Sequence, residues 1–225
     1  MKIRRVVKYN YELTEETLEK DIDKFIQKAK KGDYHMDKMY DNEGLKIIKQ
    51  YLRILNEKFK NNEIEECKNC YHKLIPFLLS ASSAEGDLFD YNDMLAMLSK
   101  DFDDYVRNYY ICLVKTCNID ELADKVSEYA SSLDVYGFDS DSDSDKEILL
   151  NNLSKEQLNQ LEEKMLGKIQ GMTKKDSGKH DVIYFLMDLA QTRRDKSRYM
   201  SLCEKFKVVV DNKEYEYLKG EYEDD

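Results

Sequence analysis

The sequence predicts an all-α protein made of antiparallel helix pairs, on the evidence of its composition and its apolar spacing. The 225 residues include one proline and eight glycines. Average usage of ~5% proline and ~7% glycine would give roughly 11 and 16 residues in a chain of this length. This shortage disfavours turn-rich all-β folds. Charged residues make up 36% of the chain, which suits helices with one apolar stripe and broad solvated faces.

Three helices are expected over residues 18–29, 48–59 and 64–78, because apolar residues recur there every three or four positions. Their stripes consist of Leu18, Ile22, Phe25, Ile26 and Ala29; of Ile48, Tyr51, Leu52, Leu55 and Phe59; and of Ile64, Cys67, Cys70, Tyr71, Leu74 and Leu78. The second and third helices form an αα-hairpin.

Capping and breaking residues mark the ends of these helices. Thr14 is the N-cap candidate of the first helix, with acidic residues in the turn that follows. Gly32 fits the position just after its end. Asn61 and Asn62 separate the second helix from the third. Pro76 removes a backbone hydrogen bond, so it is expected to kink the third helix or to end it near Ile75.

Five further helices are expected over residues 106–117, 122–133, 158–169, 182–189 and 199–206. Their stripes consist of Val106, Tyr109, Tyr110, Leu113 and Cys117; of Leu122, Val126, Tyr129 and Leu133; of Leu158, Leu161, Met165 and Ile169; of Val182, Phe185, Leu186 and Leu189; and of Tyr199, Leu202, Cys203 and Phe206. About eight helices are therefore predicted.

The helix over 158–169 has the clearest boundary signals of these five. Ser154 and Gln157 have the spacing of a capping box. Gly167 and Gly171 are expected to mark the end of the same helix.

The two ends of the chain show a different pattern that allows a small β element. Apolar residues alternate with polar ones at Ile3, Val7, Tyr9 and Tyr11, and at Val208, Val210, Tyr215 and Tyr217. Asp211 and Asn212 could form a hairpin turn in the second of these segments. The alternative continues the last helix into the acidic tail.

Helices joined by short polar turns recur along the chain. The turns are Lys31-Gly32-Asp33-Tyr34, Asn61-Asn62-Glu63-Ile64, Cys117-Asn118-Ile119-Asp120 and Arg194-Asp195-Lys196. This layout resembles tetratricopeptide-like and other α-solenoid repeats, which implies stacked helix pairs and a binding function. An irregular helical bundle is the alternative. Either would be a single domain over residues 1–225, with possible sub-units 12–135 and 146–210 joined by an acidic loop at 137–145.

Charge and cysteine content indicate the compartment and the class of partner. A net charge of −10 opposes binding to nucleic acid or to an anionic lipid surface. No apolar run reaches the ~18 residues of a membrane span, and the basic start is followed by no signal-peptide core. Five cysteines are an odd number, so reduced thiols in the cytoplasm are expected.

The acidic run at residues 139–145 resembles a calcium loop in composition but not in detail. Such a loop needs glycine at its sixth position and glutamate at its twelfth. Counting from Asp139 places Ser144 and Leu150 there, and counting from Asp141 places Lys146 and Asn152. A solvated acidic spacer is the preferred interpretation.

Cysteine and histidine do not form a recognisable zinc site. Cys67 and Cys70 lie on an apolar helix stripe, and Cys112 and Cys117 are too far apart for a zinc knuckle. Buried thiols that act as small hydrophobic side chains are the preferred interpretation for all five cysteines. The remaining candidates are His35, His72 and His180, which are too scattered for a catalytic triad, and the carboxylates Asp87, Asp90 and Asp93, which lack a second acidic cluster for magnesium.

Basic residues cluster at two places, where they could meet an acidic partner. One cluster comprises Arg193, Arg194, Lys196 and Arg198, and the other comprises Lys2, Arg4, Arg5 and Lys8. Asp195 is expected to neutralise the first cluster in part, so local charge balance is the preferred interpretation.

These observations identify no catalytic, cofactor-binding or metal-binding residue. We therefore expect a non-enzymatic protein–protein interaction module with a protein partner. The alternative is an enzyme with a metal-dependent carboxylate site, which should show a deep pocket enclosing carboxylates of raised pKa. A binding module should instead show a concave face rich in tyrosine, since the chain has 17 tyrosines.

Overall fold

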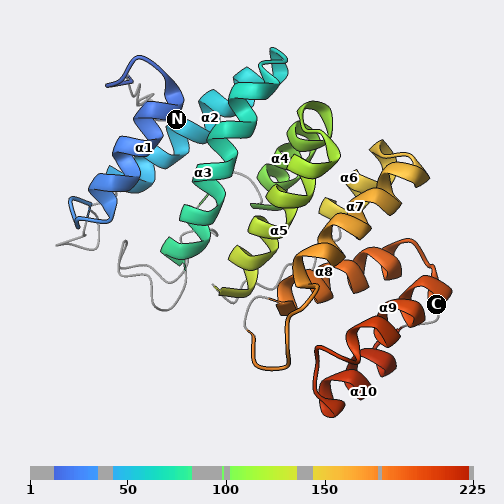
Figure 1. Ribbon diagram of the computed structural model, residues 1–225. Coiled ribbons are helices and arrows are strands. Elements are labelled where there is room, and N and C mark those ends of the chain that lie inside the picture. The colour runs from blue at the N-terminus through green and yellow to red at the C-terminus, as the bar shows by residue number, and fades with distance from the viewer. Residues whose placement is uncertain are drawn as a thin grey trace, which may run out of the picture. The chain divides into compact units, whose positions relative to one another are not determined.

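The computed structural model describes residues 13–34, 43–82, 98, 102–135, 144–176 and 179–222. Within these residues every regular element is an α-helix, which confirms the all-α prediction (Figure 1). The helices are α1 Leu18–Ala29, α2 Glu43–Lys60, α3 Ile64–Ser82, α4 Phe102–Thr116, α5 Ile119–Val135, α6 Ser144–Asn152, α7 Lys155–Ile169, α8 Lys179–Thr192, α9 Lys196–Phe206 and α10 Asn212–Gly220. None of the helices in this described part is long and apolar enough to cross a lipid bilayer.

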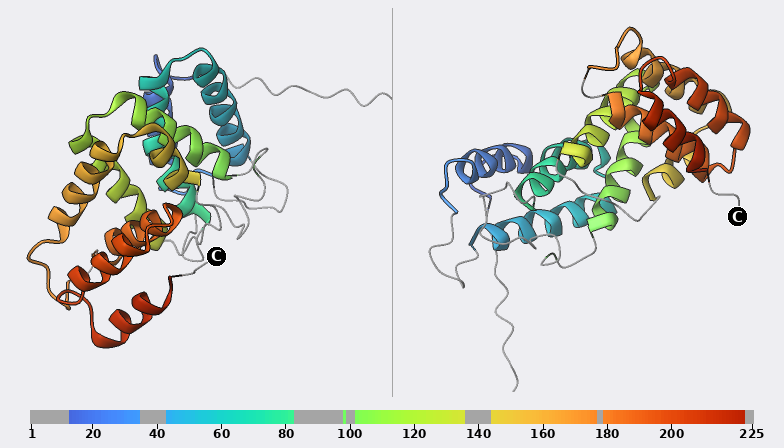
Figure 2. Two further views of the ribbon diagram at one scale, coloured as in Figure 1. Left: turned by 90° about the vertical axis from the view of Figure 1, so that its right-hand side faces the viewer. Right: turned by 90° about the horizontal axis from the view of Figure 1, so that it is seen from below.

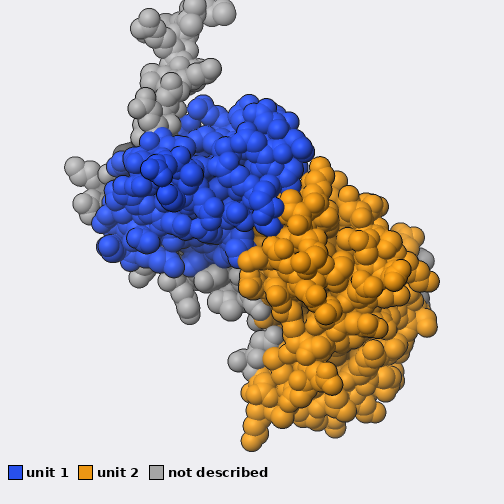
Figure 3. All heavy atoms as spheres, turned by 45° about the horizontal axis from the view of Figure 1, so that its top comes forward, with its two compact units in different colours: residues 1–101 blue, residues 102–225 orange. Residues whose placement is uncertain are grey.

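The chain divides into two compact units, residues 1–101 and residues 102–225 (Figure 3). Helices α4 and α5 of the second unit pack against α6, α7 and α8. The second unit therefore includes helices from both sides of the acidic segment 137–145. The sequence had suggested that this segment joins two sub-units, 12–135 and 146–210.

In the first unit, α1 and α2 both pack against α3, and the predicted apolar stripes form the core. Ile26 and Phe59 are half-buried, and the other stripe residues of the three helices are buried. Phe25 of α1 meets the rings of Tyr51 and Phe77 edge-on at centroid distances of 5.6 and 5.7 Å. Aromatic edge-to-face contacts of this kind stabilise a core beyond the area that they bury.

Two helix boundaries of the first unit differ from the expected ones. The side chain of Thr17, not Thr14, caps α1 by accepting a hydrogen bond from the Lys20 backbone N–H. Helix α3 does not end near Ile75 but continues through Pro76 to Ser82, because its buried face extends through Leu78, Leu79 and Ala81. Burial of that face outweighs the one hydrogen bond that proline removes.

In the second unit, α8 is the central helix. It contacts α5, α6, α7 and α9, and α10 packs against α9. The orange and red ribbons of Figure 2 show α8, α9 and α10 together in the second unit. A helix surrounded in this way needs apolar residues on most of its circumference. Seven apolar residues of α8 are buried, namely Val182, Ile183, Phe185, Leu186, Met187, Leu189 and Ala190. The predicted stripes of α4, α5, α7 and α9 are buried as well, except that Cys117 is half-buried and the side chain of Leu133 is not described.

The structure contains two helices, α6 and α10, that the apolar spacing did not predict. Helix α10 occupies the segment for which a strand was considered, so that interpretation is wrong. The carboxylate of Asp211 caps α10 by accepting a hydrogen bond from the Glu214 backbone N–H at 2.9 Å. Tyr215 and Leu218 then point into the unit. The corresponding N-terminal segment, residues 3–11, lies outside the described residues.

Candidate docking groove

An open groove of about 620 Å³ lies on the second unit, between the C-terminal half of α7 and the end of α9. Its lining comprises the apolar residues Leu166, Ile169, Met172, Phe206, Val208 and Val209, the polar residues Glu163, Gln170 and Lys205, and the glycines Gly167 and Gly171. Binding sites for ligands and peptide segments are commonly of this size and this apolar character.

The α7 wall follows from helical geometry. Glu163, Leu166, Gly167 and Gln170 are spaced three, four and seven residues apart, so they share one face of the helix. This face is adjacent to the buried face that carries Met165 and Ile169. This wall of the groove thus carries the polar residues Glu163 and Gln170, and the floor of the groove is apolar.

The α9 wall contributes both the floor and an exposed edge. Phe206 is buried and closes the bottom, whereas Val208 is 74% exposed although it lines the groove. Backbone bonds from the N–H groups of Val209 and Val210 to the Phe206 carbonyl hold the turn that presents Val208. Val208 extends the apolar lining of the groove to the surface, and a contiguous apolar surface of this kind is typical of interaction sites.

Gly167 leaves open space against the α7 backbone. A β-carbon built at this position would meet no atom within 4 Å. Glycine inside a helix costs about 0.5–1 kcal/mol relative to alanine, and the backbone of Gly167 is not left-handed, unlike that of Gly171 with φ 85°. Gly171, not Gly167, therefore follows the end of α7, and among the described residues no contact requires a glycine at position 167.

Lys179 holds the loop that directly follows the groove residue Met172. Its ammonium donates hydrogen bonds to the carbonyl oxygens of Thr173 at 3.2 Å, Lys174 at 3.1 Å and Asp176 at 2.7 Å. Only 1% of Lys179 is exposed. The buried lysine therefore holds the chain next to the α7 wall of the groove. The polar sequence around Lys179 gave no signal of this role.

Two arginines of the basic cluster, Arg193 in the turn between α8 and α9 and Arg198 on α9, pair with one carboxylate that sequence reasoning missed. Arg193 donates to one oxygen of Glu162 at 2.6 Å, and the Arg198 Nε donates to the other at 2.7 Å. Glu162 is 1% exposed. Asp195 caps α9 by accepting a hydrogen bond from the Arg198 backbone N–H at 2.9 Å, and its expected partial neutralisation of the cluster stays a prediction. Glu162 stands between Leu158 and Met165 on the apolar stripe of α7, and this position is the signal that could have identified it.

The acidic run is not a solvated spacer at its end. Asp145 lies in the first turn of α6 and is 5% exposed. Burial raises its pKa above the ordinary value, although the Lys146 ammonium lies 3.3 Å away. The charge of Asp145 also contributes to the raised pKa of Tyr110, for which burial is the main cause. Residues 139–143 lie outside the described residues.

The thiols behave as the apolar stripes predict. Cys67, Cys70, Cys112 and Cys203 are buried, Cys117 is half-buried, and none of the five forms a disulfide. Burial raises the pKa of Cys67 to about 11 and that of Cys70 to about 12, which keeps both thiols protonated and unreactive near neutral pH. Within the described ranges no group of three or more His, Cys, Asp or Glu side chains is placed to hold a metal ion.

Two histidines are described, and both are half-buried. The Nδ1 atom of His180 lies 2.7 Å from Glu214, which joins α8 to α10. His72 lies on α3. His35, Asp87, Asp90 and Asp93 lie outside the described residues, as does the N-terminal basic cluster of Lys2, Arg4, Arg5 and Lys8.

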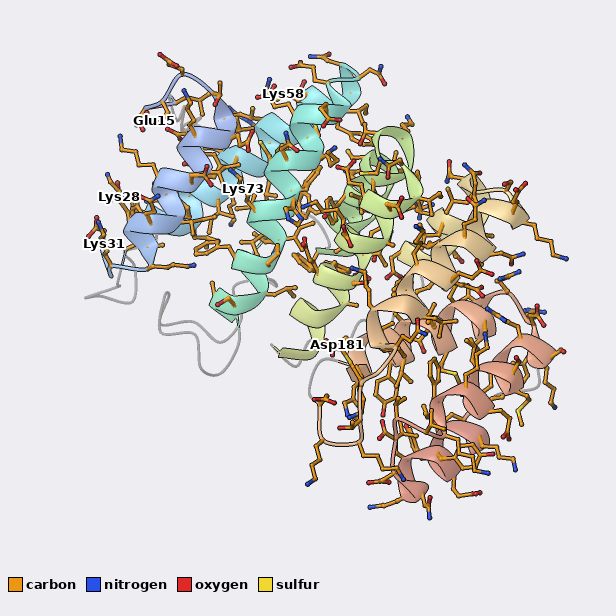
Figure 4. All side chains as sticks on the ribbon, viewed as in Figure 1. Glu15, Lys28, Lys31, Lys58, Lys73 and Asp181 are labelled. Atoms are coloured by element: carbon orange, nitrogen blue, oxygen red, sulfur yellow. The ribbon has the colours of Figure 1, made fainter. Side chains whose placement is uncertain are left out.

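The first unit has a buried carboxylate, Asp21, whose contacts are internal. One oxygen accepts from the Thr14 N–H at 2.8 Å and hydroxyl at 2.7 Å, and the other accepts from the Tyr51 hydroxyl at 2.8 Å. Lys73 of α3 pairs with Glu19 and Asp23 of α1 (Figure 4). These bonds hold α1 against α2 and α3, so they have a structural role.

The groove differs from the surface that the sequence analysis anticipated. Its lining contains no tyrosine. Asp145, whose pKa is raised by burial, does not line the groove.

No protein family model matches the chain, and neither a curated protein nor a solved structure was found to be similar to it.

Proposed function

We propose that this chain is a protein-interaction module that binds a protein partner in the groove between α7 and α9. The observation that carries the proposal is the combination of an apolar floor with an exposed apolar edge at Val208. The core of a protein interface is apolar and poor in charge, and its rim is polar. The exposed residues Glu163 and Lys205 would form such a polar rim.

Gly167 supports a partner that approaches the backbone of α7 closely. Open space next to a helical glycine lets another chain approach without meeting a side chain. The net charge of −10 favours a protein over nucleic acid or an anionic membrane. The resemblance to α-solenoid repeats and the odd number of thiols agree with a binding module in the cytoplasm.

The alternative is an enzyme with a carboxylate site, and one observation favours it. Burial raises the pKa of Asp145, and carboxyl groups with raised pKa values are frequent in active sites. Asp145 lies on α6, whereas the groove is formed by α7, its following loop and α9. Substitution of Asp145 therefore tests the alternative without altering the groove.

The groove can be tested by capture from a lysate with matched variants. Val208→Asp places a charge at the groove edge, whereas Tyr217→Asp places the same charge at a 54%-exposed position on α10 that does not line the groove. We expect proteins bound by the parent chain to be lost with Val208→Asp and retained with Tyr217→Asp. Identical sets of bound proteins for the parent and both variants would contradict the proposal.

A further inference from the structure

We infer that the partner in the groove is a second copy of this chain, related to the first by a two-fold axis. The inference rests on the proposed function, since it uses the same groove. A two-fold contact brings the same surface patch together from both copies, so each patch must be complementary to itself in shape and in charge. The groove has both properties.

The shape is self-complementary because one patch contains both a protruding and a recessed position. Val208 is 74% exposed and projects at the α9 edge. Gly167 on the α7 wall has no side chain, and a β-carbon added to it would have no other atom within 4 Å. In a two-fold contact, Val208 of each copy can enter the space beside Gly167 of the other.

The charge is self-complementary as well. Glu163 lies on the α7 wall and Lys205 on the α9 wall, and both are exposed. A two-fold axis that runs along the groove exchanges the two walls, so Glu163 of each copy faces Lys205 of the other. The net charge of −10 on each copy opposes association at long range, but salt at about 0.15 M screens this repulsion beyond roughly 8 Å. Within the patch the two charges balance.

Sedimentation of the full chain with charge-reversed variants tests the inference. The variants are Glu163→Lys, Lys205→Glu and an equimolar mixture of the two, at physiological salt over the micromolar concentration range. Each variant alone places like charges opposite each other, whereas the mixture places lysines of one copy opposite glutamates of the other. The controls Glu216→Lys and Lys213→Glu cause the same changes of net charge on α10, outside the groove.

We expect the parent and both controls to dimerise. Each groove variant alone should dimerise at least about tenfold more weakly, and the mixture should form a heterodimer of about parental affinity. Dimers of parental affinity from either groove variant alone, or a mixture that stays monomeric, would overturn the inference. A parent chain that is monomeric throughout would overturn it too. If the parent is monomeric but captures a foreign protein that Val208→Asp no longer captures, the proposed function stands without the dimer. If Val208→Asp captures the same proteins as the monomeric parent, the proposed function and the dimer both fail.

Discussion

Replacing Glu162 with glutamine tests whether the basic cluster is held by a buried charge. Glu162 accepts hydrogen bonds from both Arg193 and Arg198 and is 1% exposed. Removing one partner of a buried ion pair costs about 3–5 kcal/mol, because a charge is left uncompensated. The side chains of Arg193 and Arg198 are 15% and 27% exposed, so water rehydrates part of that charge. We therefore expect a loss of about 2–4 kcal/mol in the free energy of unfolding.

Amide hydrogen exchange in α7 and α9 is the suitable assay, since it measures opening within the second unit separately from the first. Glu216→Gln is the control, because Glu216 is exposed on α10 and its loss should change stability by less than about 0.5 kcal/mol. The triple variant Glu162→Met, Arg193→Met and Arg198→Met, which removes both the buried carboxylate and its two partners, should recover most of the loss. A free energy of unfolding for Glu162→Gln within about 0.5 kcal/mol of the parent value would refute the reasoning, since breaking a buried ion pair destabilises the fold by more than that.

Three further predictions concern the core, the groove loop and Asp145. Leu52→Ala and Leu113→Ala should each lower the free energy of unfolding by about 2–5 kcal/mol, since both residues are buried; an unchanged urea midpoint for either would show that its stripe is not core. Lys179→Met should cost about 1–3 kcal/mol through the loss of bonds from a charged donor and should speed amide exchange at residues 172–176, and unaltered exchange there would contradict its role. The raised pKa of Asp145 means that the folded state binds its proton more tightly than the unfolded chain, so stability falls as pH rises through the folded-state pKa. Asp145→Asn should hence stabilise the protein at neutral pH, and this gain should vanish in urea titrations below the ordinary carboxyl pKa of about 3.9; a gain that is independent of pH would exclude this cause.

The predicted helices were those in which burial determines the sequence pattern. A stripe such as Leu158, Leu161, Met165 and Ile169 indicates a helix with one face toward a core, and that face is buried in the structure. Helix α6 was missed because Ile148, Leu149 and Leu150 form a run too short to show a period. Helix α10 was missed because Val208, Val210, Tyr215 and Tyr217 alternate like a strand. The spacing of Asp211 and Glu214 was the helix-start signal that should have outweighed this alternation.

The groove could not be predicted from the sequence for a different reason. Its lining residues come from two helices and from the segments that follow them, and the hollow exists only because α7 and the end of α9 leave space between them. Gly167 was taken as a helix-end signal, since a sequence does not show whether a glycine is used for its backbone conformation or for the space that it leaves. The same limit applied to Lys179, whose three carbonyl partners are fixed by the path of the loop.

The burial of Lys179 makes its amine a chemical reporter of the groove wall. Acylating reagents react with accessible lysine amines, and Lys174 and Lys175 of the same loop are exposed whereas Lys179 is 1% exposed. Acylation of Lys179 therefore requires the loop to open, and its rate relative to that of its two neighbours measures how often this happens. Because Met172 belongs to both the loop and the groove, an occupied groove should slow the acylation of Lys179 selectively. The loop thus carries its own internal standard for groove occupancy, within a single peptide.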